Sequence, residues 1–195
     1  ICDPIDTYAS IKLAVERVIL EKYGDQFETA ILRPTAVFGP GGKNLLKLAN
    51  DLRNGNRITN YFKSCLFNYR RMNLVCIDNV VSAIEFLINV EKKVEREVFI
   101  ISDDDDLSNN YHSIEKYLLK SFGYDNYLLP IIPLPLIFLN IILRLTGKPF
   151  FNINKKYECK KILRSGYEKS ILFDEGLFYF ADWYKNKIIK TESTK

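Results

Sequence analysis

The segment DPIDTYASIKLAVERVI, residues 3–19, carries the strongest structural signal in the sequence. Its apolar side chains recur at helical spacing and Gly24 supplies a C-terminal stop, so the pattern predicts a helix from Thr7 to Tyr23. Within that helix Tyr8 and Lys12 form a YxxxK pair. Residues four apart share one face of a helix, so the phenol and the ammonium can point into the same site.

This pair suits acid–base chemistry. An ordinary tyrosine loses its proton near pH ~10, which is too high for a base at neutral pH. A neighbouring ammonium favours the phenolate, which can accept a proton from a hydroxyl as hydride leaves, or return one during reduction. The spacing alone is weak support, because Tyr157 and Lys161 form a second YxxxK, which we interpret as a solvated helix face.

Short apolar runs alternate with helical patterns along the rest of the chain. We predict strands over 29–32, 58–62, 74–77 and 97–101, and helices over 44–53, 79–90, 110–122, 157–163 and 174–186. A glycine-rich loop covers 37–42, and Asp78 is the expected N-cap of the helix that begins at Asn79. The alternation predicts an α/β layered protein.

Composition narrows the class of protein further. The chain has 195 residues, 47% of them hydrophobic, and its net charge of +4 is spread without a long basic stripe, so we expect no nucleic-acid partner. Four dispersed cysteines and a single histidine make no zinc set, so no metal is expected. The acidic run 103–106 is predicted to be a solvated loop rather than a metal site, His112 a helix-surface residue, and Trp183 a packing residue.

One segment raises the question of a membrane. Residues 128–145, LLPIIPLPLIFLNIILRL, are strongly apolar, but three prolines interrupt the first half, and Asn140 and Arg144 the second. A spanning helix needs ~20 predominantly apolar residues. We therefore predict a buried or substrate-covering helix, with peripheral membrane contact as the alternative. No secretory signal opens the sequence, so a cytoplasmic protein with reduced cysteines is expected.

Five segments in order resemble one known family. They are DPIDTYASIKLAVERVI, AILRPTAVFGPGGKN from Ala30, RRMNLVCIDNVVSAI from Arg70, EVFIISDDDDLSNNYHSIEKYLLKSFG from Glu97, and CKKILRSGYEKSILFDEGLFYFADWY from Cys159. Together they resemble the extended short-chain dehydrogenase/reductases, the NAD-dependent epimerases and dehydratases. Within that family the proline-led apolar helix and the short glycine loop are most similar to bacterial surface-polysaccharide (O-antigen) enzymes, the UDP-sugar 4-epimerases and 4-keto-sugar reductases.

The resemblance implies a fold and a division of the chain. It implies an incomplete Rossmann-type fold, a doubly wound parallel sheet lacking its N-terminal half, with a small α/β substrate-binding region. Residues 1–42 would be the remainder of the dinucleotide-binding domain. Residues 43–195 would mostly bind the nucleotide sugar, with some elements returning to the Rossmann sheet. A homodimer through the active-site helix is compatible with the resemblance.

The resemblance also assigns roles to individual residues. Tyr8 would be the general acid/base, and Lys12 would support it and hold the nicotinamide ribose of NAD or NADP. The residues expected along the nicotinamide are Pro34, Thr35, Ala36 and Val37. The residues expected to contact the nucleotide-sugar substrate are Arg33, Asn44 at the start of a helix, and Arg71 on the diphosphate. Arg70 is an alternative for the last role.

Three functions remain open. The chain would be the C-terminal part of a nucleotide-sugar 4-epimerase or oxidoreductase, a non-catalytic remnant that binds nucleotide sugar weakly, or part of a dehydrogenase of sterols or other apolar alcohols. The choice of sugar, the choice among epimerase, reductase and dehydratase, and the choice of NAD or NADP are not fixed by these residues. The GxxGxxG turn that cradles the cofactor pyrophosphate does not occur in this sequence.

We therefore expect a polypeptide of these 195 residues to show no measurable NAD(H) binding and to be inactive alone. The physical reason is that the pyrophosphate cradle supplies the backbone donors on which dinucleotide affinity depends. Isothermal titration calorimetry with NAD⁺ and NADH is the measurement. Tight, stoichiometric binding would show that the expectation is wrong.

Overall fold

The computed structural model describes residues 7–24, 26–91, 94, 96–145 and 155–189. In chain order the elements are α1 (Thr7–Val18), η1 (Ile19–Tyr23, π-helical), β1 (Ala30–Pro34), β2 (Ala36–Phe38), α2 (Leu46–Asn54), α3 (Arg57–Phe67), β3 (Leu74–Cys76), α4 (Ile77–Asn89), β4 (Glu97–Ile101), α5 (Tyr111–Phe122), α6 (Leu136–Leu145), α7 (Lys160–Arg164), α8 (Phe173–Trp183) and η2 (Tyr184–Ile189, π-helical).

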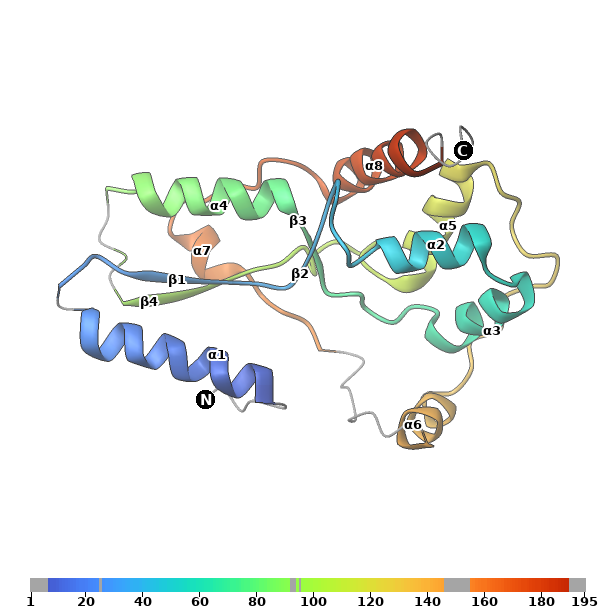
Figure 1. The fold of residues 1–195 in the computed structure, drawn as a ribbon, viewed down its shortest axis with the longest axis horizontal. Helices are drawn as coiled ribbons and strands as arrows, with labels where there is room; N and C mark the ends of the chain where they lie inside the picture. The colour runs from blue at the N-terminus through green and yellow to red at the C-terminus, as the bar shows by residue number, and fades with distance from the viewer. Residues whose placement is uncertain (1–6, 25, 92–93, 95, 146–154, 190–195) are drawn as a thin grey trace.

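Two pairs of parallel strands form the middle of the molecule. β1 pairs with β4 along its length, from Ala30 opposite Glu97 to Pro34 opposite Ile101. β2 pairs with β3, with Val37 opposite Val75. Figure 1 places α4 and α7 on one side of the β1–β4 pair and α1 on the other. Parallel strands covered by helices are the expected α/β arrangement, so the predicted fold class is confirmed.

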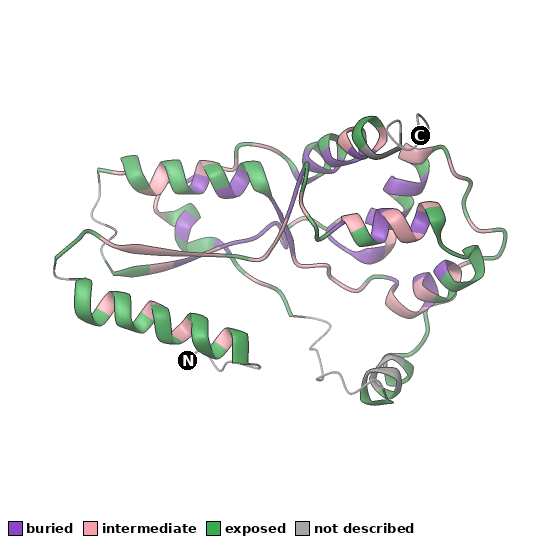
Figure 2. Cartoon of the chain, viewed as in Figure 1, coloured by how far each residue is buried: buried purple, intermediate pink, exposed green. Residues whose placement is uncertain are grey.

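The apolar side chains form two cores. The larger lies among β2, β3, α2, α5 and α8, and the smaller lies between the β1–β4 pair, α4 and α7. At Gly176 a Cβ atom would come within 2.8 Å of Cys76 Sγ and 3.1 Å of Phe38 Cζ, so only glycine lets α8 approach the strands this closely. In Figure 2 the buried residues gather in these cores, whereas α1 buries no residue and carries only exposed and intermediate ones.

The acidic loop after β4 is the main departure from the sequence prediction. Asp103 and Asp104 are each 1% exposed, so the expectation of a solvated loop is wrong for both. Asp103 accepts hydrogen bonds from Cys76 N at 2.9 Å and Asn79 Nδ2 at 3.2 Å, and it pairs with Lys169 Nζ at 2.8 Å. These partners satisfy the carboxylate, which is the condition for burying a charge.

Asp104 joins a different set of segments. Its Oδ2 atom accepts from Asn73 Nδ2 at 2.6 Å and from Tyr157 N at 2.8 Å, while Oδ1 accepts from Asn109 Nδ2 at 3.2 Å. Three chain segments therefore meet at one buried carboxylate.

Two other local predictions are corrected. The strand expected over 58–62 is wrong, because that stretch lies in α3. Asn56 caps this helix by accepting from Ile58 N and Thr59 N, and its buried residues Asn60 and Ser64 repeat at helical spacing. Asp78 is not an N-cap, since α4 begins at Ile77 and Asp78 lies in its first turn.

Most other elements were predicted within a few residues. β4 has the predicted bounds, and the helix expected over 7–23 is formed by α1 and its continuation η1. Residues 36–38, expected at the edge of the glycine loop, form the short strand β2. Trp183 packs against the larger core, as predicted. The apolar helix α6 has ten residues, and among the described helices none combines the length and apolar character that a membrane crossing requires.

The buried carboxylate of Asp103 supplies a test of this packing. We expect Asp103→Ala to lower the free energy of unfolding by roughly 3–5 kcal/mol, because it leaves the Lys169 ammonium half-buried without its counter-ion. Urea denaturation is the measurement. Glu158→Ala, which removes an exposed ion pair with Lys160, should cost no more than about 1 kcal/mol. Equal effects of the two substitutions would contradict the structural role of Asp103.

Candidate functional site

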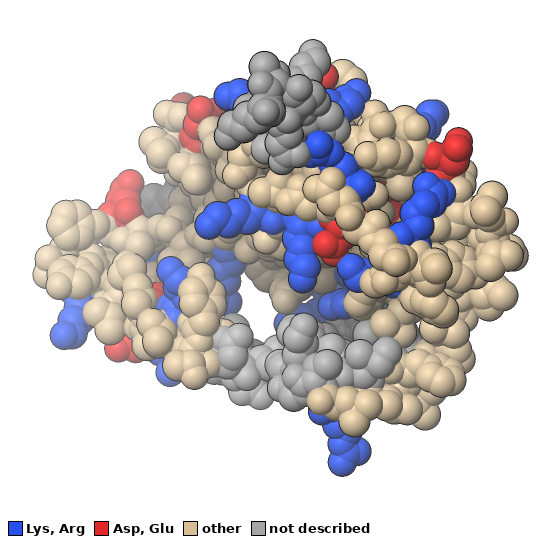
Figure 3. Space-filling view, turned by 45° about the vertical axis from the view of Figure 1, so that its right-hand side comes forward, with Lys and Arg blue, Asp and Glu red and all other residues tan. Residues whose placement is uncertain are grey.

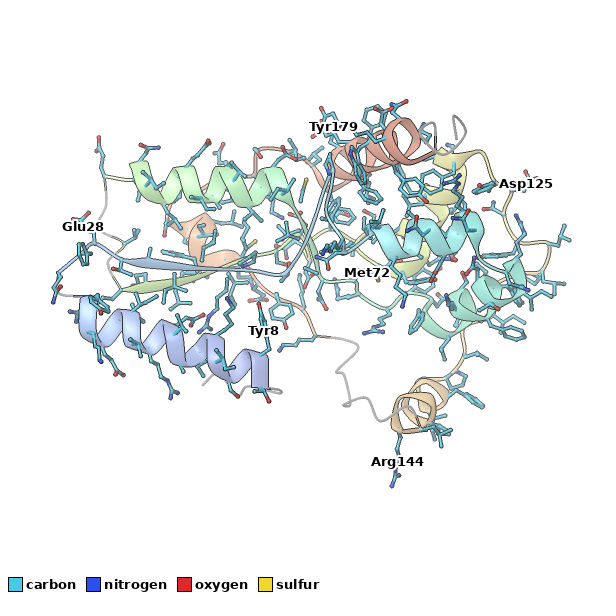
Figure 4. The ribbon with its side chains drawn as sticks, in the orientation of Figure 1. Tyr8, Glu28, Met72, Asp125, Arg144 and Tyr179 are labelled. Carbon is cyan, nitrogen blue, oxygen red and sulfur yellow. The ribbon has the colours of Figure 1, made fainter. Side chains whose placement is uncertain are left out.

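Tyr8 and Lys12 lie on one face of the first turns of α1. Lys12 Nζ is 5.7 Å from the centroid of the Tyr8 ring. The Tyr8 side chain is 70% exposed, so its hydroxyl is open to a ligand. Figure 4 shows Tyr8 at the end of α1 nearest the centre of the molecule. The helix thus presents a phenol and an ammonium together at an accessible position.

Arg33 connects α1 to the strand layer. Its guanidinium donates from Nε to the Glu16 carboxylate at 2.9 Å and from Nη2 to the same carboxylate, a two-pronged ion pair. The two side chains are only partly exposed, so solvent screens this pair less than a surface one. Arg33 therefore has a structural partner on the active-site-like helix, and its contact with substrate stays a prediction.

The segment Pro34–Val37 runs from β1 into β2. Thr35 N donates to Ile101 O at 3.1 Å and Ala36 N donates to Asn73 O at 2.9 Å, so these backbone groups are used within the fold. Thr35 Oγ1, by contrast, is buried and has no hydrogen-bond partner among the described residues. A buried polar atom that the fold does not satisfy is unusual. It is compatible with the predicted place of this segment beside a polar cofactor ring.

Asn44 closes the glycine loop rather than beginning a helix. α2 begins at Leu46, with Leu45 at its N-cap, so Asn44 precedes the helix. Its Nδ2 atom donates to the carbonyl of Val37, and the side chain is exposed. The amide thus joins the loop to β2, and the predicted contact with a diphosphate stays a prediction.

Arg71 and Arg70 differ in their surroundings. Arg71 Nη1 donates to the main-chain carbonyl of Asp104 at 2.8 Å, which orients the guanidinium, and no described carboxylate pairs with it. The Arg70 guanidinium lies over the Phe67 ring at 5.4 Å, and burial lowers its pKa. Arg71 is therefore the better placed of the two for an anionic ligand. Figure 3 shows Lys and Arg side chains gathered beside a hollow in the surface that it presents.

Asn73 links the predicted residues, although the sequence pattern did not single it out. Its carbonyl accepts from Ala36 N, and its amide reaches Asp104. The segment expected along the cofactor and the segment that carries Arg71 are therefore joined through one residue. A signal was present in the sequence, because asparagine is one of the few residues that adopt a positive φ, as Asn73 does at 49°.

A cavity among the described residues lies away from the predicted site. It has a volume of about 340 Å³, and none of the residues predicted for the site lines it. Its lining is mostly aromatic or apolar and includes Asn68, Tyr69, His112, Glu115, Lys116, Leu119, Asn126, Tyr127, Leu129, Pro130, Ile131 and Pro133. His112 was predicted to be an ordinary surface residue, yet its Nδ1 atom is buried without a partner among the described residues.

Glu115 is the buried acid of this cavity. Its side chain accepts hydrogen bonds from Ser64 Oγ and from Tyr127 OH, the latter at 2.8 Å. Burial raises the pKa of Glu115, and the bonds from Ser64 and Tyr127 oppose that rise without cancelling it. The carboxyl joins α3, α5 and the segment after α5, so it supports the region that was predicted to bind substrate rather than the Tyr8 region.

Comparison with known proteins gives a family and a set of similar folds. A family model described as the 3-beta hydroxysteroid dehydrogenase/isomerase family matches residues 2–135. Among curated proteins nothing matches the chain significantly.

Three solved structures illustrate the fold. A dTDP-glucose 4,6-dehydratase from Bacillus anthracis in complex with NAD is 15% identical, with a TM-score of 0.65, over 100% of this chain and 57% of that one. A UDP-glucose 4-epimerase from Thermus thermophilus, also with NAD, is 14% identical, with a TM-score of 0.64, over 95% and 56%. A UDP-glucuronic acid 4-epimerase from Bacillus cereus is 17% identical, with a TM-score of 0.57, over 95% and 54%. The chain spans about half the length of each.

The Glu115 carboxyl predicts a pH dependence. Because its pKa is raised in the folded state, folding stability should fall as the pH rises above the ordinary glutamate value of about 4.3, and the loss is complete above the folded-state pKa. Glu115→Gln cannot ionise at position 115. The melting temperature of this variant minus that of the unsubstituted chain should therefore be several degrees larger at about pH 8 than at about pH 4.5, with roughly 2–4 °C for each kcal/mol of stability. Thermal melts measure this difference. A difference that does not change with pH would contradict it, and Glu158→Gln, on the surface, is the control.

Proposed function

Because the chain belongs to the 3-beta hydroxysteroid dehydrogenase/isomerase family, we propose that Tyr8 and Lys12 are the acid–base pair of a NAD(P)-dependent enzyme that acts on a nucleotide sugar. The observation that carries the proposal is the approach of Lys12 Nζ to the exposed Tyr8 ring, at 5.7 Å, on one face of α1. The family match and the similar folds support the assignment to the extended short-chain dehydrogenase/reductases.

The roles of the two side chains follow from their chemistry. The Tyr8 hydroxyl would take the proton from a sugar hydroxyl during oxidation and return it during reduction. The Lys12 ammonium would stabilise the phenolate that results, and it could also donate to a ribose hydroxyl. A nicotinamide cofactor, NAD or NADP, would supply the hydride acceptor. Pro34, Thr35, Ala36 and Val37 would lie along its ring, where the unsatisfied Thr35 hydroxyl fits a polar group.

The charges on the substrate side support a diphosphate. Arg71 is held by a main-chain carbonyl, and a guanidinium matches phosphate oxygens with two parallel donors. Asn44 lies exposed at the end of the glycine loop, where its amide could reach the same ligand. Structures with this fold include enzymes named for dTDP-glucose and UDP-glucose. From the resemblance to O-antigen enzymes we propose an epimerisation or a 4-keto reduction in surface-polysaccharide sugar synthesis.

A second candidate is oxidation of a hydroxysteroid or another apolar alcohol. The name of the matching family favours it, and α6 exposes Ile137, Phe138 and Ile141, which an apolar substrate could contact. The Tyr8–Lys12 chemistry would be the same for this substrate. Arg71 has no role in it, because an apolar alcohol carries no phosphate, and we therefore favour the nucleotide sugar.

Turnover by the protein expressed from its complete reading frame distinguishes the candidates. We expect conversion of UDP-glucose or UDP-N-acetylglucosamine and no conversion of a 3β-hydroxysteroid. Chromatographic separation of the sugar nucleotides measures the conversion. Tyr8→Phe removes the proton that the mechanism transfers, so kcat should fall by about 10²–10⁴-fold. Tyr179→Phe, at an exposed position on α8, is the matched control. Unchanged kcat in Tyr8→Phe would exclude its catalytic role, and turnover of the steroid alone would establish the second candidate.

A further inference from the structure

Two segments that are far apart in the sequence meet at Asp104. Arg71 Nη1 donates to the Asp104 carbonyl at 2.8 Å, and Tyr157 N donates to Asp104 Oδ2 at 2.8 Å. One buried residue therefore holds the Arg71 guanidinium and the chain at residues 155–157 next to each other. Nothing in the sequence pattern predicts this meeting, since the two segments are separated by α4, β4, α5 and α6.

Asn73 stabilises this arrangement with two further hydrogen bonds. Its Nδ2 atom donates both to Asp104 Oδ2, at 2.6 Å, and to the Lys155 carbonyl, at 2.8 Å. Its φ of 49° lies in the left-handed region, which is uncommon for residues other than glycine and asparagine. The backbone of Lys155 is thus fixed relative to Arg71 by side-chain hydrogen bonds with defined directions.

Lys155 differs from the other lysines around it. Lys156 pairs with Asp105 at 2.8 Å, Lys160 pairs with Glu158 at 2.9 Å, and Lys161 pairs with Glu97. Lys155 is exposed, and among the described residues it has no acidic partner. Its ammonium lies 4.8 Å from the centroid of the Tyr157 ring, which holds the cation in one region without neutralising it.

The acidic groups of this loop do not cancel these charges. Arg71 contacts the main-chain carbonyl of Asp104, not its carboxylate. That carboxylate is 1% exposed and is satisfied by Asn73, Asn109 and the amide of Tyr157. Two cations without acidic partners among the described residues therefore come from segments that are both bonded to Asp104 and Asn73. An anion with several oxygens can bridge such a pair, with the fork of arginine on some oxygens and the point charge of lysine on others.

We propose that Lys155 is a second substrate-binding cation, which holds the diphosphate of the nucleotide sugar together with Arg71, and that Asn73 positions Lys155 while Asp104 positions Arg71. This inference rests on the proposed function, because it concerns the same substrate. It adds a ligand from a distant part of the chain to the predicted set. It also explains why a buried carboxylate and an asparagine with positive φ occur side by side at this point of the fold.

The affinity of the whole chain for UDP, measured by isothermal titration calorimetry, tests the role of Lys155. We expect Lys155→Gln to weaken UDP binding by about tenfold, in line with the loss of one charge-assisted contact, and Arg71→Gln to weaken it by at least as much. Lys156→Gln is the matched control, since its neighbouring charge is already paired with Asp105, and it should stay within about twofold of the unsubstituted chain. The UDP affinity of Lys155→Gln should also fall less steeply with salt concentration than that of the unsubstituted chain.

The positioning role needs a readout that a general loss of stability would not produce. Asn73→Gly keeps access to the left-handed backbone and removes only the amide. If Asn73 acts through Lys155, then Asn73→Gly should weaken UDP binding in the unsubstituted chain but have little further effect in Lys155→Gln. Additive losses in the double variant would overturn the positioning role.

The outcomes separate the two proposals. If Lys155→Gln binds UDP like Lys156→Gln while Arg71→Gln binds weakly, the inference about Lys155 is wrong and the proposed function stands. If the unsubstituted chain binds no UDP at millimolar concentration, the nucleotide-sugar function and the inference both fail. Weakening by Lys155→Gln of UDP binding, but not of inorganic phosphate binding, supports a contact made specifically by the diphosphate.

Discussion

Burial of the Asp103 and Asp104 carboxylates is the constraint on which the arrangement of this chain depends. A buried carboxylate must be surrounded by donors, since an unpaired one would cost several kcal/mol. The donors come from β3, α4, the start of α5 and the segments around Tyr157 and Lys169. Burial alone would lower the Lys169 pKa, but the hydrogen bond and charge of Asp103 outweigh that effect and raise it. The C-terminal segments are therefore held against the strands by directional bonds, in addition to the apolar packing of α8.

The proposed catalytic pair depends on a weaker kind of support. α1 buries none of its side chains, and its connection to the strands includes the ion pair between Arg33 and Glu16. Tyr8 remains exposed at the end of this helix, as a group that exchanges protons with a substrate must be. The proposed substrate side is different, because Arg71 and Lys155 are held by the buried network around Asp104. The proposed anion site and the proposed proton donor thus derive from different parts of the fold.

The family match concerns the chemistry of the reaction, whereas the proposed substrate contacts concern the choice of substrate. Membership of the hydroxysteroid dehydrogenase/isomerase family supports the proposed tyrosine–lysine chemistry, which sugar- and steroid-directed enzymes can share. Substrate choice depends instead on groups away from that pair. In this chain those groups are cations without acidic partners among the described residues, which favours a ligand with a diphosphate over an apolar alcohol.

The sequence by itself determined the α/β class, the position of most helices and strands, and the Tyr8–Lys12 pair, because helical and strand periodicity and a four-residue spacing are local properties. It misplaced residues 58–62, where a capping asparagine outweighed an apparent strand pattern, and it assigned Asp103 and Asp104 to solvent. Only the tertiary structure decided that those carboxylates are buried and that the segments of Arg71 and Tyr157 meet at Asp104. Whether a charge is buried depends on donors from distant segments, and no local pattern records where those segments will lie.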